Sequence, residues 1–269
     1  MRSFVTIDGK PVDGDLPLRS LFYGEGVFET FRWKGRPPVF FGHHLKRMER
    51  GCKFLCVPFS PKRIVWAVER TVELAGIDDA RVKVCVVSLG PLRFSSRPAA
   101  SRTVVLVERY RIKAGPWKCC IATTRRNSSS PLCKIKSLNY LENVVARRTA
   151  EGKGFDEAIF LNERAEVAEG TTTNIFWIND GRLFTPAIDC GALPGITRKV
   201  VMDLAKDAGV EVVEGCFKLK SLLNSQGAFL TNSIIGLVEI ETIEKTQLER
   251  GGELIKGLRE RLFTALGWK

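Results

Sequence analysis

The sequence has very few histidines and no closely paired cysteines, and both shortages narrow the chemistry open to it. Its only two histidines are adjacent, at His43 and His44. The eight cysteines form no C-x-x-C pair and no zinc-ligand spacing, and a G-x-S-x-G motif is absent. We therefore expect neither a metal site nor a disulfide framework. Acid–base chemistry is expected to fall to lysine, glutamate or tyrosine, with a cofactor as one option.

Long hydrophobic runs are also missing. No apolar stretch approaches the roughly 20 residues that a membrane span requires, and Asp8 stands where a signal peptide would have its apolar core. Hydrophobic residues make up 44% of the chain and charged residues 27%, which is typical of a globular protein. The sequence thus predicts a cytoplasmic protein with no membrane partner. Its 269 residues are enough for two domains.

Charge of one sign predominates without being concentrated. Lys and Arg total 42 against 30 Asp and Glu, a net charge of +12. The basic residues are spread from Arg2 to Lys269, and the densest pairs, Arg125-Arg126 and Arg147-Arg148, are short. A nucleic-acid-binding module therefore remains only a remote alternative. A solvated basic surface, or an anionic small substrate, explains the excess better.

The first half of the chain reads as strands mixed with helices. A hairpin around Lys34-Gly35 is expected to join strands at 27–33 and 38–41. Ser60-Pro61 is typical of a helix start, and apolar spacing predicts a helix that ends at Gly76. Two further strands are expected at the ranges 81–89 and 103–109.

The second half alternates between the two kinds of element. Helices are expected at about 138–151, 198–208 and 253–266. Strands are expected at 119–124, 157–161, 174–178, 210–213 and 228–231. This alternation predicts an α/β (or α+β) protein with a small domain at 1–113, a linker at 114–118 and a larger domain at 119–269.

Four segments of the sequence carry chemistry. Lys134 and Lys136 lie on one face of an extended segment before a helix, and Glu169 precedes a run of threonines. The glycine turn 193–198 opens a helix whose backbone N–H groups could hold a phosphate, and the hydroxyls of 231–233 could reach the same anion. Pyridoxal phosphate needs such a set, because its aldehyde condenses with a lysine, its ring nitrogen pairs with an acid and its phosphate binds N–H groups and arginine.

These segments resemble the fold-type IV, or class IV aminotransferase-like, family of pyridoxal phosphate enzymes. Six blocks carry the resemblance in family order: Tyr23-Gly-Glu-Gly-Val-Phe-Glu29, His44-Leu-Lys-Arg47-Met, Lys136-Ser-Leu-Asn-Tyr140, Glu169-Gly-Thr-Thr-Thr-Asn-Ile-Phe176, Leu193-Pro-Gly-Ile-Thr-Arg198 and Phe229-Leu-Thr-Asn-Ser233. Together they span nearly the whole chain. The resemblance implies a two-domain D-amino-acid aminotransferase-like fold with pyridoxal phosphate in the interdomain cleft, and a homodimer.

The resemblance also implies a role for individual residues. Lys136 matches the Schiff-base lysine, which also moves the proton on the substrate carbon, and Glu169 matches the acid that faces the ring nitrogen. The phosphate is expected to bind four residues, namely Arg47, Ile196, Thr197 and Ser233. Lys134 lacks the family register, and His44 is interpreted as part of a helix start.

Less specific matches concern the cofactor's edge and the substrate. Tyr140 is expected to reach the phenolic oxygen of the cofactor, although core packing explains it nearly as well. Phe28 and Tyr23 are expected on the substrate side, with packing as the alternative for Tyr23. Arg93 or Arg97 could bind a substrate carboxylate, although loop charge also accounts for both.

The family contains two kinds of enzyme that fit the sequence. The chain length and the segments 26–32 and 229–233 favour the 4-amino-4-deoxychorismate lyases, which release pyruvate and 4-aminobenzoate for folate biosynthesis. The alternative is an aminotransferase acting on D-amino acids or on branched-chain L-amino acids. A lyase substrate with two carboxylates would suit the positive charge.

Overall fold

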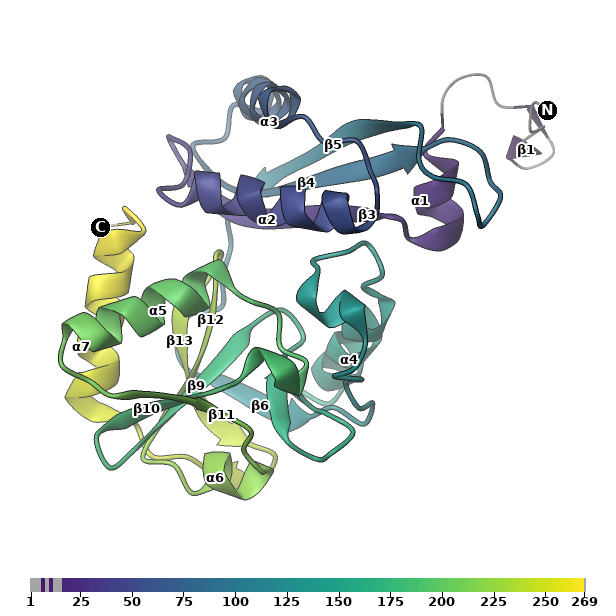
Figure 1. The fold of residues 1–269 in the computed structure, drawn as a ribbon. Helices are drawn as coiled ribbons and strands as arrows, with labels where there is room; N and C mark the ends of the chain where they lie inside the picture. The colour runs from purple at the N-terminus through teal and green to yellow at the C-terminus, as the bar shows by residue number, and fades with distance from the viewer. Residues whose placement is uncertain (1–5, 8–9, 12–15, 269) are drawn as a thin grey trace.

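A computed structural model describes residues 6–7, 10–11 and 16–268 (Figure 1). The α-helices are α1 (Leu18–Tyr23), α2 (Phe41–Phe54), α3 (Pro61–Ala75), α4 (Leu141–Gly152), α5 (Ile196–Asp207), α6 (Leu219–Leu223) and α7 (Gly252–Ala265), with short 3-10 helices η1 (Pro131–Lys134) and η2 (Ile188–Cys190). The strands are β1 (Thr6–Ile7), β2 (Lys10–Pro11), β3 (Gly26–Lys34), β4 (Asp79–Leu89), β5 (Ala100–Arg109), β6 (Trp117–Ile121), β7 (Glu157–Leu161), β8 (Val167–Gly170), β9 (Asn174–Asn179), β10 (Arg182–Pro186), β11 (Val212–Gly215), β12 (Ala228–Asn232), β13 (Gly236–Ile243) and β14 (Thr246–Gln247).

The first half of the chain is built on the antiparallel sheet β3-β4-β5. Alternation along β4 buries Val82, Val84 and Val86 in a core with residues of α2 and α3. Arg81 and Lys83 alternate with these valines and therefore lie on the opposite face of the sheet. Arg81 and Lys83 line a cavity together with Tyr140 and Thr197 of the second half, so this face of the sheet is turned toward the second half.

The second half is built on a nine-stranded sheet with the order β11-β10-β9-β12-β13-β6-β7-β8 and with β14 paired to β13. Helices α5 and α7 pack together against one part of this sheet (Figure 1), around Phe176, Phe229 and Leu258. Near the other end of the strand order, α4 packs on β7. The sheet curls, because β8 at the end of that order lies close to β9. The mixed α/β architecture agrees with the fold class expected from the sequence.

The predicted hairpin around Lys34-Gly35 is wrong. Gly35 does turn the chain, with a φ of +66°, but residues 38–40 form no strand and α2 begins at Phe41. Strand β3 pairs instead with β4, in the register that places Thr30 opposite Lys83. The turn signal was local, whereas the partner strand lies some 50 residues further along the chain, beyond two helices.

The connection between the two halves runs from Tyr110 to Pro116. Strand β6 begins at Trp117, inside the range 114–118 that the sequence suggested for a linker. Its backbone pairs in parallel with β13 and β7, so the second sheet starts at the end of this connection. Within the described part of the chain, none of the helices is long and apolar enough to cross a membrane.

Candidate active site

Lys136 lies on an extended segment between η1 and α4, and the first sheet fixes its backbone. The N–H of Phe28 donates to the carbonyl of Lys136 (2.9 Å), and the N–H of Leu138 donates to Gly26 (3.0 Å). Val27 and Ser137 form an antiparallel bridge. The lysine therefore belongs to the second half by sequence, but its register is set by β3 in the first half.

Two cavities meet at Lys136. The larger, about 640 Å³, extends between the two sheets, and the smaller, about 270 Å³, extends toward β8. Both are lined by the side chains of Lys136, Tyr140, Asn174 and Leu193, among others. An amine at this junction can react with a molecule that occupies both spaces.

One end of the larger cavity can bind an anion. Gly195 precedes α5, so the N–H groups of Ile196 and Thr197 in its first turn have no partner within the helix. The hydroxyls of Thr197 and Ser233 lie 3.1 Å apart, and the guanidinium of Arg47 is bonded to the adjacent carbonyl of Pro194 (3.1 Å). Helix N–H groups, hydroxyls and an arginine together suit a phosphate.

A buried carboxylate holds Arg47 in place. Glu29 accepts hydrogen bonds from Nε and Nη2 of Arg47, both at 2.6 Å, and from Nδ1 of His44 at 2.7 Å. Burial acts to raise the pKa of Glu29, but Arg47 and His44 outweigh it and lower that pKa to about 2. Burial lowers the pKa of His44, so this ring is neutral at neutral pH and donates its Nδ1–H to Glu29. The result is an ionised Glu29 paired with a charged Arg47.

The smaller cavity contains a second buried carboxylate, Glu169 on β8. Its Oε2 accepts from the N–H of Leu193 (2.8 Å), and its Oε1 accepts from Nη2 of Arg126 (3.2 Å). Burial raises the pKa of Glu169, while Arg126 and the hydrogen bond from Leu193 act in the opposite direction. A carboxylate held between these donors can accept a further hydrogen bond from a protonated nitrogen of a molecule in the cavity.

Two aromatic rings enclose the amine of Lys136. Its Nζ lies 4.6 Å from the ring centre of Phe28 and 5.3 Å from that of Tyr140. Burial, followed by the charge of Arg47, lowers the pKa of Lys136 to about 8. The hydroxyl of Tyr140 donates to the carbonyl of Thr171 (2.8 Å), which leaves its oxygen able to accept a further hydrogen bond. About a tenth of the Lys136 amine is thus unprotonated at pH 7, far more than for a lysine with the ordinary pKa of 10.5.

The site residues expected from the sequence fall into two groups in space. Those lining one or both cavities are Arg47, Lys136, Tyr140, Glu169, Ile196, Thr197, Ser233 and Phe28. Tyr23, Arg93 and Arg97 line neither cavity. The hydroxyl of Tyr23 donates to Leu92, and Phe94 packs on its ring, while Arg93 and Arg97 are exposed in the same loop. Lys134 forms a surface ion pair with Asp189 (3.0 Å).

Sequence reasoning missed several residues of the site. Glu29 was recognised only as part of a motif. It lies between the apolar Val27 and Phe31 on the buried face of β3, and a carboxylate in such a position needs a buried cation as its partner. Arg126 was considered only as surface charge. Lys83 alternates with buried valines, but its place over Phe28, 4.5 Å from the ring centre, required the β3–β4 register.

Known proteins share the sequence pattern and the fold. The family model for amino-transferase class IV matches residues 26–243. The aminodeoxychorismate lyase of Bacillus subtilis is 31% identical over 246 residues, which cover 88% of this chain and 84% of the lyase. A Legionella pneumophila structure described as a putative 4-amino-4-deoxychorismate lyase is 28% identical, with a TM-score of 0.87 over 91% of this chain and 93% of that one. The branched-chain aminotransferase of Thermoproteus uzoniensis, solved with norvaline, is 27% identical, with a TM-score of 0.86 over 97% and 94% of the two chains.

Proposed function

Because the chain belongs to the class IV aminotransferase family, we propose that it is a pyridoxal phosphate-dependent 4-amino-4-deoxychorismate lyase, which releases pyruvate and leaves 4-aminobenzoate, a step in folate biosynthesis. The lyase from Bacillus subtilis and the structure from Legionella pneumophila support this assignment. The observation that carries it is the charge of the larger cavity.

The residues at the two cavities fit pyridoxal phosphate. The phosphate would bind the N-terminus of α5, Thr197, Ser233 and Arg47, and the ring nitrogen would face Glu169. A Cβ at Gly195 would come within 1.9 Å of Oδ1 of Asn174. The turn before α5 therefore has no room for a side chain next to the proposed phosphate site. When bound, the cofactor supplies an aldehyde for the lysine and a ring that draws electrons from the substrate carbon.

The chain's own residues would then perform three tasks. Nζ of Lys136 takes the proton from the substrate carbon that bears the amine, because it is the amine at the junction of the two cavities. Glu169, held by Arg126 and the N–H of Leu193, would keep a proton on the ring nitrogen. Phe28 and Tyr140 exclude water around Nζ, which keeps part of the lysine unprotonated.

The wall of the larger cavity is strongly basic. Besides Arg47 and Lys136 it contains Arg81, Lys83, Arg111, Lys113 and Arg147, against two acids, Glu151 and Asp156. Arg81, Lys113 and Arg147 each pair with a carboxylate, whereas the ammonium of Lys83 lies over Phe28, beside the reacting amine. The positive wall attracts both carboxylates of a dicarboxylate substrate, whereas a branched aliphatic side chain gains nothing from the positive charge. The charge therefore favours the lyase.

The test is to follow pyruvate after adding aminodeoxychorismate to the holoenzyme. We expect pyruvate and 4-aminobenzoate in equal amounts, with no need for a keto-acid acceptor. A parallel panel of L- and D-amino acids, each with a keto acid, should give little transfer. Rapid exchange with one amino acid and no pyruvate from aminodeoxychorismate would contradict the proposal.

An aminotransferase acting on branched-chain L-amino acids, or on D-amino acids, is the second candidate. The aminotransferase of Thermoproteus uzoniensis has the same fold over nearly the whole chain. The same cavity also contains apolar side chains, among them Ile112, Val144 and Ile234, which could receive an aliphatic group. The amino-acid panel distinguishes this candidate and reveals the handedness of its substrate.

The pKa of Lys136 predicts how cofactor loading depends on pH. Only the free amine attacks an aldehyde, and the pKa of this amine is about 8, so the rate at which apoenzyme acquires the visible absorption of lysine-bound pyridoxal phosphate should rise through pH 8 and level off by about pH 9. Stopped-flow absorbance measures this rate. A Lys134→Ala control should give the same profile, and a rate that rises until pH 10 or beyond would contradict the lowered pKa.

Lys83 provides a test of the carboxylate-binding wall. Replacing it by methionine keeps most of the side-chain volume over Phe28 but removes the charge. Loss of a charge-assisted hydrogen bond of about 1.5–3 kcal/mol predicts a KM for aminodeoxychorismate raised about 10- to 100-fold, with little change in kcat. The matched control is Lys113→Met, because Lys113 is paired with Asp156 at the rim (2.6 Å) and is more than half exposed. Equal KM values for wild type and Lys83→Met would exclude a substrate contact.

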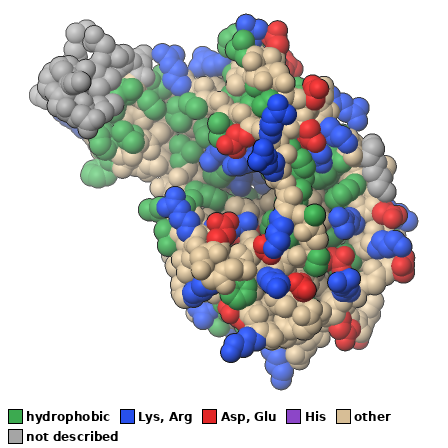
Figure 2. Space-filling model, turned by 180° about the vertical axis from the view of Figure 1, so that it is seen from behind, with side chains coloured by type: hydrophobic (Ala, Val, Ile, Leu, Met, Phe, Trp, Pro, Cys, Tyr) green, Lys and Arg blue, Asp and Glu red, His purple; other side chains and the backbone are tan. Residues whose placement is uncertain are grey.

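The proposal places the enzyme in the cytoplasm and divides the chain into domains at 1–113 and 119–269. It also includes a homodimer. Large apolar side chains are exposed on α1, on α4 and in the loop after β4, at Leu21, Phe22, Phe94 and Leu141. Figure 2 shows hydrophobic side chains gathered at the end of the first half that carries α1. A second copy would bury such side chains. Sedimentation equilibrium of the holoenzyme should therefore give twice the chain mass.

A further inference from the structure

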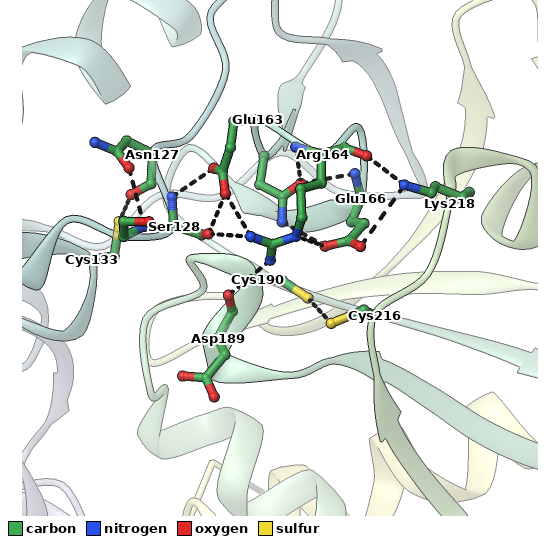
Figure 3. A network of polar contacts seen from close by, with 12 residues as sticks. Asn127, Ser128, Cys133, Glu163, Arg164, Glu166, Asp189, Cys190, Cys216 and Lys218 are labelled. Carbon is green, nitrogen blue, oxygen red and sulfur yellow. Dashed lines mark hydrogen bonds and ion pairs between the residues drawn. The ribbon is translucent and has the colours of Figure 1, made fainter.

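Two cysteines that are 26 residues apart in the sequence meet beside the curled end of the large sheet (Figure 3). Cys190 ends η2, and Cys216 follows β11. Their sulfur atoms are 3.2 Å apart, and both are free thiols. The thiol of Cys190 donates to the sulfur of Cys216 and also lies 3.7 Å from the carbonyl of Gly215.

The two thiols differ in access to solvent. Cys190 is fully buried, whereas Cys216 is exposed. Burial, followed by the hydrogen bond to Cys216, raises the pKa of Cys190 to about 12, so this thiol stays protonated. The sulfur of Cys216 interacts electrostatically with the guanidinium of Arg164 (Figure 3). Cys216 is thus the thiol that a dissolved disulfide can reach, and the Cys190 sulfur lies 3.2 Å from it.

We propose that Cys216 and Cys190 form a site for thiol–disulfide exchange with a small disulfide such as oxidised glutathione. The thiolate of Cys216 attacks one sulfur of the small disulfide, whose S–S bond breaks and releases one small thiolate. Cys190 then loses its proton to solvent and attacks the sulfur of Cys216, which expels the second small thiolate. Two protein thiols are oxidised to one disulfide, and one small disulfide is reduced to two thiols; an excess of thiol reverses both steps.

The geometry needs little change for this reaction. The sulfurs must approach from 3.2 Å to about 2.05 Å, the length of a disulfide bond. Cys190 leads through Gly191 into the segment that places the N–H of Leu193 on Glu169 (2.8 Å). Oxidation would thus tie β11 to the segment that bounds the cofactor cavities.

Glu166 lies close enough to make a metal site the competing explanation. Its carboxylate and the two sulfurs lie within 4.8 Å of one another. However, Oε2 of Glu166 already accepts from Nε of Arg164 and from Asn162, each at 2.9 Å, and the ammonium of Lys218 lies 3.9 Å from Oε1. A divalent cation would have to bind beside two positive charges, which favours exchange chemistry over metal binding.

The experiment uses reduced holoenzyme treated with oxidised glutathione, quenched with acid and alkylated in denaturant. We expect wild type to lose two alkylatable thiols and to yield a Cys190–Cys216 peptide pair that dithiothreitol separates. Cys216→Ser should yield no such pair and should keep Cys190 alkylatable. The matched control is Cys56→Ser, which removes the other exposed cysteine and should yield the same crosslink as wild type.

Three outcomes would overturn the proposal. The first is wild type in which both thiols stay alkylatable. The second is wild type that carries glutathione on Cys216 while Cys190 remains a free thiol. The third is protection of both thiols by stoichiometric zinc, which would point to a metal site. The readout is the mass of peptides, so it does not depend on the activity of the enzyme.

Discussion

Turnover by the Lys136→Ala variant is expected to fall by at least about 10⁴-fold, because the variant lacks both the amine that binds the cofactor and the base that moves the substrate proton. The variant should still bind pyridoxal phosphate through Arg47, Thr197 and Ser233, but without the visible absorption of the lysine-bound form. Pyruvate release measures turnover, and absorbance measures the bound form.

Two further measurements show whether this loss reflects chemistry. Lys134→Ala removes a lysine two residues away that forms a surface pair with Asp189, so it should keep near wild-type turnover. A small primary amine added to Lys136→Ala should restore part of the activity, since it can enter the space left by the side chain. Normal turnover in Lys136→Ala would overturn the assignment of this lysine.

The Glu29→Gln variant is expected to lose about 3–5 kcal/mol of unfolding free energy, because it leaves the buried guanidinium of Arg47 without its counter-charge. Urea unfolding of the apoenzyme measures this loss. The loss should be smaller in holoenzyme, where a bound phosphate would supply negative charge to Arg47. Asp79→Asn is the matched control, because Asp79 pairs with Arg32 but is 42% exposed, and its loss should be about 1 kcal/mol or less. Equal losses in the two variants would contradict the role of Glu29.

The same carboxylate predicts how stability depends on acid. The pKa of Glu29 is lowered from 4.5 to about 2 in the folded chain, so its contribution is fully present above pH 4.5 and is lost as the pH falls toward 2. That contribution is on the order of 3 kcal/mol. The unfolding free energy of Glu29→Gln should lack this decrease at acid pH. The unfolding free energies of the variant and of wild type should therefore converge as the pH approaches 2.

Local signals in the sequence predicted the elements that local chemistry determines. The helix α3 has the expected bounds, because Ser60 caps its first turn (3.4 Å to the N–H of Arg63) and Gly76 ends it with a φ of +60°. Strand β7 also has the expected bounds. By contrast, α4 begins at Leu141 rather than at 138, because residues 136–138 pair with β3. That pairing, like the partner of β3, depends on contacts between distant segments.

The same distinction applies to the site. Motifs placed Lys136, Glu169 and Arg47 at the cavities, because each motif combines a reactive side chain with the local backbone that supports it. The neighbours that tune these groups come from other elements: Glu29 faces Arg47 from β3, Arg126 faces Glu169 from the loop after β6, and Lys83 lies over Phe28 from β4. No spacing along the chain reports such contacts.

The pairing of residues 136–138 with β3 also limits how this enzyme can be divided or recombined. A fragment that begins at β6 would contain Lys136, Glu169 and Ser233, yet it would lack the backbone groups of Gly26 and Phe28 that fix the register of the lysine. The first half could be exchanged for that of a relative with activity preserved only under one condition. The incoming strand must present a carbonyl and an N–H at the positions of Gly26 and Phe28, in the same register with residues 136–138. Recombination within this family is therefore expected to succeed when 26–28 and 136–138 are inherited from one parent, and to fail when they are mixed.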